Sequence, residues 1–238
     1  MRIDIRKPRS GRQEMPFRGL VYGPEGVGKS TFAADTPTPY FFDPTGGTDE
    51  LDLDRVDRPE DGSEFTWDDL LDVVRQLATV KHEWKTLVID ELGAVEAMAW
   101  NKICLRDGKA DIEAYGYSKG YEIVLKEWRT LLRDLEILRH QGVNVMFLAH
   151  SQVKTFKNPE GEDFDRYVPL IHHKLAGLLK QWVDFVFFAR FEELVDVDKN
   201  KRRRGVSTGV HVIHTKRKAS FDAKNRYNLP EELRLDWH

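Results

Sequence analysis

Residues 22–31 of the chain read Tyr22-Gly23-Pro24-Glu25-Gly26-Val27-Gly28-Lys29-Ser30-Thr31. From Gly23 to Ser30 they follow the pattern Gly-x-x-x-x-Gly-Lys-Ser, in which each fixed position has a physical reason. The two fixed glycines adopt backbone angles that a Cβ would forbid, so the loop turns its N–H groups toward a phosphate. Lys29 reaches the β- and γ-phosphates as a point charge, and Ser30 offers its hydroxyl to Mg²⁺. We therefore predict that residues 23–31 bind a nucleoside triphosphate and that Lys29 also takes part in catalysis.

The segments on either side of this loop have the character that a phosphate-binding loop requires. Residues 17–22 form a short apolar strand, and residues 30–34 open a helix that Pro37 and Pro39 bring to an end. The alternative is a flexible glycine-rich turn with an incidental lysine. Chance places the eight-residue pattern in roughly one chain in a hundred of this size, so its occurrence in this setting favours a phosphate loop.

Length and composition limit what the rest of the chain can be. Its 238 residues are enough for one α/β domain with a real core; 40% of them are hydrophobic and 32% are charged. The formal net charge of −3 does not indicate a polyanion-binding protein, so any contact with nucleic acid must come from a local patch. The lone cysteine, Cys104, fits a reducing compartment, and no apolar run approaches the ~18 residues that span a bilayer. We expect a cytoplasmic protein with no membrane partner.

The order of predicted strands and helices gives the fold class. Short apolar runs predict strands at residues 17–22, 40–43, 53–56, 86–90, 143–149 and 183–189. Apolar residues at helical spacing predict helices at residues 67–80, 118–140 and 172–181. Continuous apolar strands between helices are typical of a parallel sheet that is covered on both faces. We predict an α/β fold with a mostly parallel central sheet, a basic arm at residues 1–16 and a single domain at residues 17–238.

The last part of the chain is predicted to be rich in strands. Residues 194–197 and 210–215 flank the most basic segment, residues 199–204, which reads Lys-Asn-Lys-Arg-Arg-Arg. Such a run is typical of an exposed turn between strands, and contact with phosphates is the alternative.

Acidic residues follow two of the predicted strands. Asp90 ends the strand at residues 86–89, where a second Mg²⁺ ligand is expected beside Ser30. Glu91 comes next, and it either activates the attacking water or caps the following helix. Asp43 ends the strand after the loop helix. We expect that strand to lie beside the loop strand, so Asp43 is a second candidate for orienting the water.

Several motifs along the chain point to one family. They are Tyr-Gly-Pro-Glu-Gly-Val-Gly-Lys-Ser-Thr at 22–31, Phe-Phe-Asp-Pro-Thr-Gly-Gly-Thr at 41–48, Leu-Val-Ile-Asp at 87–90, Tyr-Gly-Tyr-Ser-Lys-Gly-Tyr at 115–121, Leu-Ala-His-Ser-Gln at 148–152 and Phe-Asp-Ala-Lys-Asn-Arg-Tyr-Asn-Leu-Pro at 221–230. From about residue 18 to residue 235 the chain resembles RecA-like phage ATPases, in particular phage nucleotide-binding proteins related to the Sak-type single-strand annealing proteins. The first motif occurs in many unrelated ATPases, whereas the last two together are more selective.

The resemblance implies a RecA-like core that binds ATP and Mg²⁺ and hydrolyses ATP in response to single-stranded DNA. The implied task is annealing or strand pairing in phage recombination or replication, in the cytoplasm of a host bacterium, with single-strand-binding protein as a further partner. In RecA-like proteins the catalytic glutamate lies two residues after the aspartate that ends the second strand, and here that position is Thr45. Either Glu91 has taken the role of base or hydrolysis is slow.

The segment after the strand at residues 143–149 corresponds to the region that couples nucleotide to DNA in RecA-like proteins. Gln152 is the candidate sensor of the γ-phosphate and His150 is the second candidate; ordinary polar residues at a strand end are the alternative. Residues 153–174 correspond to the DNA loop. Their basic and aromatic residues are Lys154, Phe156, Lys157, Phe164, Arg166, Tyr167, His172, His173 and Lys174. The acidic residues between 160 and 165 cancel part of this charge, so a solvated hairpin is an alternative to a DNA groove.

Lys224-Asn225-Arg226 resembles the Lys-Asn-Arg strand of hexameric replicative helicases, whose cations reach the γ-phosphate on the neighbouring subunit. The resemblance implies a homo-oligomer, a ring or a filament, in which Lys224 and Arg226 complete the ATP site of the next copy. Lys216 and Arg217 are nearby candidates for the same role. The alternative interpretation is a surface strand of alternating charge with no catalytic role.

Two other functions fit the same loop. A small-molecule kinase would transfer phosphate to a metabolite and would use residues 199–204 as an arginine-rich lid. A nucleotide-dependent adaptor, such as a loader for a helicase or for single-strand-binding protein, would hydrolyse little ATP, as Thr45 suggests. ATP hydrolysis with and without single-stranded DNA distinguishes the three functions.

Overall fold

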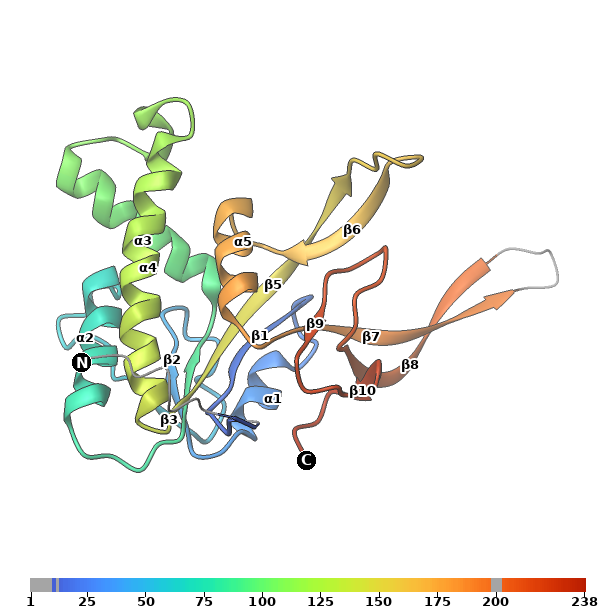
Figure 1. Cartoon of the computed structure of the whole chain (residues 1–238), viewed down its shortest axis with the longest axis horizontal. Helices are drawn as coiled ribbons and strands as arrows, with labels where there is room; N and C mark the ends of the chain where they lie inside the picture. The colour runs from blue at the N-terminus through green and yellow to red at the C-terminus, as the bar shows by residue number, and fades with distance from the viewer. Residues whose placement is uncertain (1–9, 12, 198–202) are drawn as a thin grey trace.

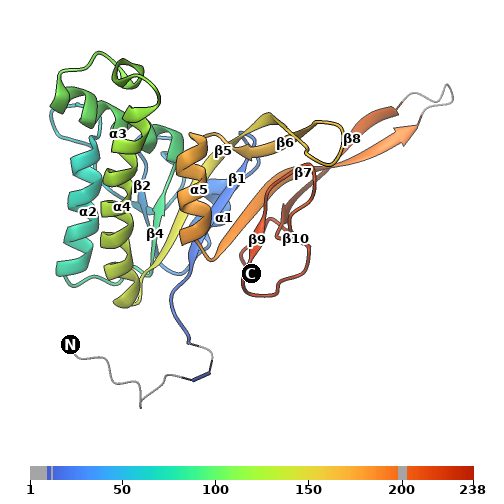
Figure 2. The ribbon, with the colours of Figure 1, turned by 45° about the horizontal axis from the view of Figure 1, so that its top comes forward.

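The strand that leads into the glycine-rich loop lies in the middle of the central sheet. The computed structural model of the chain describes residues 10–11, 13–197 and 203–238. In it, β1 (Arg18–Gly23) pairs in parallel with β5 (Asn144–Phe156) on one side and with β7 (Phe185–Val197) on the other. Beyond β5 come β4 (Thr86–Ile89), β2 (Pro39–Phe42) and β3 (Asp54–Arg55), all in parallel (Figures 1 and 2).

The other half of the sheet is antiparallel and comes from the end of the chain. β8 (Arg203–His214) pairs with β7, and β10 (Glu232–Arg234) pairs with β8, which gives the order β10-β8-β7-β1-β5-β4-β2-β3. β9 (Lys224–Asn225) adds to the start of β7, and β6 (Phe164–Pro169) pairs with the far end of β5. The predicted α/β class, with a mostly parallel sheet and a strand-rich end, is confirmed.

The strand that ends before Asp43 does not lie where the sequence predicts. The prediction places β2 beside β1, but β4 and β5 separate the two strands. The reason is the apolar run of β5, since residues 145–149 are fully buried and a strand is covered on both faces only inside the sheet. Asp43 therefore lies further from the glycine-rich loop than predicted.

Helices cover the two faces of the sheet unequally. One face carries α2 (Trp67–Thr79), α3 (Leu92–Asp107), α4 (Lys119–His140) and α5 (His173–Trp182), with the 3₁₀ helix η1 (Ile112–Tyr115) between α3 and α4 (Figure 2). The opposite face carries the short α1 (Lys29–Ala34) and the C-terminal Trp237. The helices predicted at residues 67–80, 118–140 and 172–181 correspond to α2, α4 and α5. Within the described residues, no helix combines the length and the apolar composition needed to cross a membrane.

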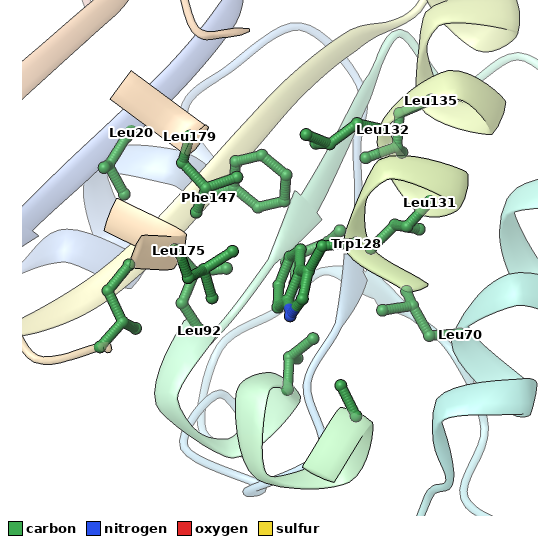
Figure 3. Packing of buried hydrophobic residues seen from close by; sticks show 14 of the residues in the cluster. Leu20, Leu70, Leu92, Trp128, Leu131, Leu132, Leu135, Phe147, Leu175 and Leu179 are labelled. Atoms are coloured by element: carbon green, nitrogen blue, oxygen red, sulfur yellow. The ribbon is translucent and has the colours of Figure 1, made fainter. Parts of the chain in front are cut away.

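Alternate residues of β1 belong to two separate cores. Leu20 and Tyr22 pack with the helices of the larger layer, whereas Val21 packs on the side of α1. The larger core surrounds Trp128 of α4, whose ring meets that of Trp67 in α2 at 5.1 Å between centroids. Figure 3 shows Trp128 among the leucines of this core. Burial on both faces fixes β1 and so fixes the point at which the glycine-rich loop begins.

Two strands run beyond the sheet into protruding hairpins. β5 is one continuous strand of 13 residues whose second half pairs with β6, so the segment at residues 153–169 forms the hairpin given above as an alternative to a DNA groove. β7 also continues outward, so the strands predicted at residues 183–189 and 194–197 are one strand, with a register shift between Phe191 and Glu193. Residues 199–202 of the basic turn, and most of the predicted arm at residues 1–16, lie outside the described residues.

Candidate nucleotide-binding site

The glycines of the loop occupy positions that other residues would not tolerate. Gly28, the N-cap of α1, has φ 97° and ψ 23°, and Gly26 has φ 71°; both are in the left-handed region. A Cβ on Gly23 would come within 2.3 Å of the carbonyl oxygen of Ala189 in β7. The loop therefore has the backbone angles and the close packing that a phosphate cradle requires.

Lys29 is buried beneath the loop to which it belongs. Its Nζ donates hydrogen bonds to the carbonyl oxygens of Gly23 at 3.1 Å and Pro24 at 2.8 Å, and lies 3.5 Å from Nδ1 of His150. Burial lowers the pKa of Lys29, and the negative charges of nearby carboxylates oppose this shift. Because its hydrogen-bond acceptors are neutral carbonyls, an anionic phosphate would be a stronger partner for this ammonium group.

Ser30 and Asp90 join the start of α1 to the end of β4. The Ser30 hydroxyl donates a 2.6 Å hydrogen bond to Oδ2 of Asp90. Burial raises the pKa of Asp90; the Ser30 hydrogen bond opposes this shift and the charge of Asp43 adds to it. A hydroxyl and a carboxylate are the oxygen ligands that suit Mg²⁺, which usually takes its other ligands from phosphate and water. The pair fits such an ion, and among the described residues no group of three His, Cys, Asp or Glu could hold a metal by itself.

Glu91 caps a helix with one oxygen and keeps the other unpaired. As the N-cap of α3, it accepts at Oε1 a 3.0 Å hydrogen bond from the backbone N–H of Ala94. Its Oε2 is buried and has no hydrogen-bond partner in the described part of the chain. The structure thus shows the capping contact, and the second oxygen remains able to accept a proton, so the role as base stays a prediction.

Both carboxylate oxygens of Asp43 are engaged within the loop that follows β2. Oδ1 accepts from the N–H and the hydroxyl of Thr45 and from the N–H of Gly46, while Oδ2 accepts from the N–H and the hydroxyl of Thr48. Burial raises the pKa of Asp43, but these hydrogen bonds outweigh it and lower the pKa overall. An acidic carboxylate with so many donors is a weak base, so Glu91 is the stronger of the two candidates.

Of the two predicted sensors, His150 is the one in contact with the loop. It pairs with Gly23 in the β1–β5 register, and its ring lies beside Lys29. Gln152 is two residues further along β5, where its Nε2 donates a 3.0 Å hydrogen bond to the carbonyl of Pro169 in β6. The two residues therefore span the step from the glycine-rich loop to the β5–β6 hairpin.

Lys224 and Arg226 lie at the opposite end of the sheet from the loop. β9 pairs with the start of β7, whereas the loop follows the end of β1. The Nζ of Lys224 donates to the carbonyl oxygens of Lys180 and Val183, and burial lowers its pKa. Arg226 is half exposed and donates a 3.0 Å hydrogen bond to Asp184. Because a strand's length separates them from the loop, any catalytic role requires a second copy of the chain.

One cation of the predicted DNA loop has a structural role instead. Arg166 is 7% exposed, its guanidinium lies 4.1 Å from the ring centroid of Phe156 and 5.2 Å from that of Phe164, and its Nε donates to the carbonyl of Ala219. This guanidinium thus helps to hold the hairpin on the body of the protein, and contact of the other basic and aromatic residues with DNA stays a prediction.

Two residues that contact the loop could not be predicted from the sequence. His211 of β8 and Leu235, just after β10, lie against Gly28. They come from the far end of the chain and belong to no recognisable motif, so only the pairing of β7, β8 and β10 brings them to the loop.

The central parallel strand, its glycine-rich loop and the Ser30–Asp90 pair make this chain a P-loop NTPase in class. A family model described as an AAA domain matches residues 15–227, and the chain belongs to this family. Membership of this family indicates nucleotide binding and an activity of the ATPase class, and ATP and Mg²⁺ are the usual ligands of such domains. No curated protein matches the chain. The likeness to phage annealing proteins stays a prediction.

Proposed function

We propose that the protein is an ATPase that binds single-stranded DNA and promotes annealing or strand pairing in phage recombination or replication. The observation that supports this most is β5, which contacts the phosphate loop through His150 and continues without a break into the protruding hairpin (Figure 1). A continuous strand can transmit a displacement at the loop to the hairpin, as a DNA-coupled ATPase requires.

The β5–β6 hairpin carries a surface suited to unpaired bases. Val153 and Tyr167 face each other across the two strands, and they are 54% and 43% exposed. Lys154, next to Val153, is exposed as well. Strand alternation places Lys154 on the opposite face of the hairpin from Tyr167, so the hairpin offers stacking to a base on one face and charge to a phosphate on the other, the two contacts that single strands need.

At the phosphate loop each side chain has a proposed task. Lys29 binds the β- and γ-phosphates, while Ser30 and Asp90 hold Mg²⁺, which neutralises phosphate charge. Glu91 takes the proton of the attacking water at Oε2, while the helix N–H at Oε1 keeps the carboxylate oriented. His150, through its contact with Lys29, responds to the γ-phosphate.

Arg226 rather than Lys224 is the residue that we propose to act on the next copy in a ring or filament. Within the described residues its hydrogen bond goes to Asp184, which Arg18 also binds, so that carboxylate keeps a cationic partner when Arg226 moves away. Lys224 is bound to two carbonyls behind β9 and would lose both contacts.

ATP hydrolysis by the purified chain, with and without single-stranded DNA, tests the proposal. We expect turnover to rise several-fold on adding DNA, and the effect to weaken as salt increases. The Lys29→Ala variant controls for contaminating ATPases. Turnover that ignores DNA but responds to a nucleoside or a sugar would instead identify a kinase, whose predicted lid begins outside the described residues.

A nucleotide-dependent adaptor with little hydrolysis is a second candidate, working with a helicase or with single-strand-binding protein in the cytoplasm. Thr45 stands at the position of the catalytic glutamate of RecA-like proteins, and its hydroxyl donates a hydrogen bond to Asp43. Such an adaptor would bind ATP normally and show negligible turnover both with and without DNA, which separates it from the first candidate in the same experiment.

A further inference from the structure

The junction between the glycine-rich loop and α1 has different neighbours on its two sides. Toward β4 and β5 the neighbours are polar, with Asp90 bonded to the serine of the loop and His150 beside its lysine. Toward β7 they are a leucine and a histidine ring. The atoms nearest to a Cβ built on Gly28 are Cδ2 of Leu235 at 3.5 Å and Nδ1 of His211 at 3.7 Å.

His211 and Leu235 are held beside the loop by backbone pairing and by a third side chain. The N–H of Leu235 donates a 2.9 Å hydrogen bond to the carbonyl of His211. Phe191, the partner of His211 across β7 and β8, meets the His211 ring edge to face, with centroids 4.9 Å apart and an interplanar angle of 86°. All three side chains are partly exposed. Together Phe191, His211 and Leu235 form a shelf beside the loop that a ligand can reach.

A nucleoside triphosphate needs different partners at its two ends. The loop lysine and the Ser30–Asp90 pair fix the charged end on the β4 side. The nucleoside then leaves the loop on the β7 side, where the shelf offers aromatic and aliphatic surface of the kind that binds flat, weakly polar rings. We propose that Phe191, His211 and Leu235 bind the base of the nucleotide. This inference rests on the proposed binding of a nucleotide at the loop.

The composition of the shelf also predicts how selective it is. Rings and a leucine contact the face of a base, and every base has a π-face, so such contacts tolerate different bases. The His211 ring is the one hydrogen-bonding side chain of the three. We therefore expect ATP and GTP to bind within about tenfold of each other, and inorganic tripolyphosphate, which has no base, to bind more weakly than either.

Isothermal titration calorimetry with Mg²⁺ separates the shelf from the loop. The two ligands are a non-hydrolysable ATP analogue and inorganic tripolyphosphate. Phe191→Ala and His211→Ala should each weaken binding of the analogue on the order of tenfold and leave tripolyphosphate binding unchanged. Lys29→Ala should abolish binding of both. The matched controls are Tyr117→Ala and His140→Ala, exposed residues on the distant α3–α4 region, which should change neither affinity.

Each result has a definite reading. Unchanged analogue affinity in both shelf variants overturns the proposal, and so does an equal loss for both ligands, which would mean that the shelf only supports the loop. If the wild-type protein binds tripolyphosphate as tightly as the analogue, the loop functions but the base has no site, and the proposal fails alone. If the wild-type protein binds neither ligand, nucleotide binding fails and the shelf with it.

Discussion

The amino end and the carboxyl end of the parallel strands both carry buried charges, and the two ends pair them differently. At the amino end, Arg18 of β1 donates from Nη2 and Nε to the two oxygens of Asp184 at 2.7 and 3.2 Å, and from Nη1 to Glu136 at 3.1 Å. Arg139 binds Glu136 and Arg226 binds Asp184. Every cation in this network has a carboxylate partner, whereas Lys224, outside the network at the same end, donates to two neutral carbonyls.

At the carboxyl end the charged groups have weaker partners. Lys29 donates to neutral carbonyls, and Oε2 of Glu91 has no hydrogen-bond partner among the described residues. Burial raises the pKa of Asp90, whereas that of Asp184 is lowered, because the hydrogen bonds and charge of Arg18 outweigh its burial. An incompletely paired buried charge lowers the free energy of unfolding.

The difference in pairing distinguishes charges that stabilise the fold from charges that a bound ligand would pair. The amino-end network holds β1, α4 and the start of β7 together. The carboxyl end keeps groups that phosphate and Mg²⁺ would pair, which is the pattern of a functional site. Arg226 lies on the boundary, since it belongs to the amino-end network of its own chain and is proposed to act at the carboxyl end of the next.

Removing Arg226 has the largest expected effect on this comparison. Arg226→Ala should lower turnover on the order of a thousandfold, as when an arginine supplied by a neighbour is lost. The free energy of unfolding should fall by only about 1 kcal/mol, because one hydrogen bond to Asp184 disappears. ATP hydrolysis and thermal unfolding measure the two quantities on the same sample.

Mixing two inactive variants is the control for action between copies. In an equal mixture of Arg226→Ala and Lys29→Ala, roughly one interface in four joins an intact loop to an intact arginine, so part of the activity should return. No recovery at any ratio would restrict Arg226 to the amino-end network.

The next effect concerns the unpaired oxygen of Glu91. Glu91→Gln should lower turnover about a hundredfold or more while ATP binding is retained. The amide oxygen can still accept the hydrogen bond from Ala94, so the cap of α3 survives and lost proton transfer is isolated from lost structure. Single-turnover hydrolysis and calorimetry measure the two steps. Turnover equal to that of the wild type would leave Glu91 with its capping role alone.

The phosphate loop could be predicted because its requirements are local. Gly28 needs a left-handed backbone, and Lys29 and Ser30 follow it in sequence, so one short segment contains the whole cradle. Asp90 could also be placed, because parallel strands end at one edge of the sheet. The position of Asp43 could not be predicted. It depends on β5, which is roughly a hundred residues further along the chain and lies between β1 and β4 in the sheet.

The contacts that sequence reasoning missed depend on tertiary pairing. His211 and Leu235 reach Gly28 only because β7, β8 and β10 pair in order, and nothing in their own neighbourhood indicates a nucleotide. Arg166 shows the converse. Its sequence pattern suits DNA contact. In the fold, however, its guanidinium packs on two phenylalanine rings and donates a hydrogen bond to a backbone carbonyl.

Neutralising one carboxylate at each end should change stability in opposite directions. Asp184→Asn leaves the buried Arg18 with a weakened partner and should lower the free energy of unfolding by about 3 kcal/mol. Asp90→Asn removes a charge that burial disfavours and should raise it on the order of 1 kcal/mol. Urea unfolding at neutral pH measures both. A loss of stability in both variants would contradict the distinction between the two ends.

The pH dependence follows from the two pKa directions. The folded pKa of Asp184 is below its unfolded value, so its contribution is present above about pH 4 and is lost as pH falls through the folded pKa. The folded pKa of Asp90 is above its unfolded value, so its cost appears as pH rises from about 4 through the folded pKa. Each variant should therefore approach wild-type stability in acid, measured as unfolding midpoints across that range.

The smallest expected effect lies outside both ends, on the β5–β6 hairpin. Tyr167→Ala removes a ring that is 43% exposed and also stacks on Phe188, and it should weaken binding of an oligo-dT strand on the order of tenfold, because one base loses its stacking partner. ATP affinity should stay the same, since the backbone carbonyl of Tyr167 that accepts from Tyr22 is retained. Fluorescence anisotropy at fixed salt measures the DNA affinity, with Tyr117→Ala as the matched exposed tyrosine. If Tyr167→Ala binds DNA as tightly as Tyr117→Ala, the hairpin is not part of the DNA-binding surface. The extension of β5 beyond the sheet then has no role in DNA binding.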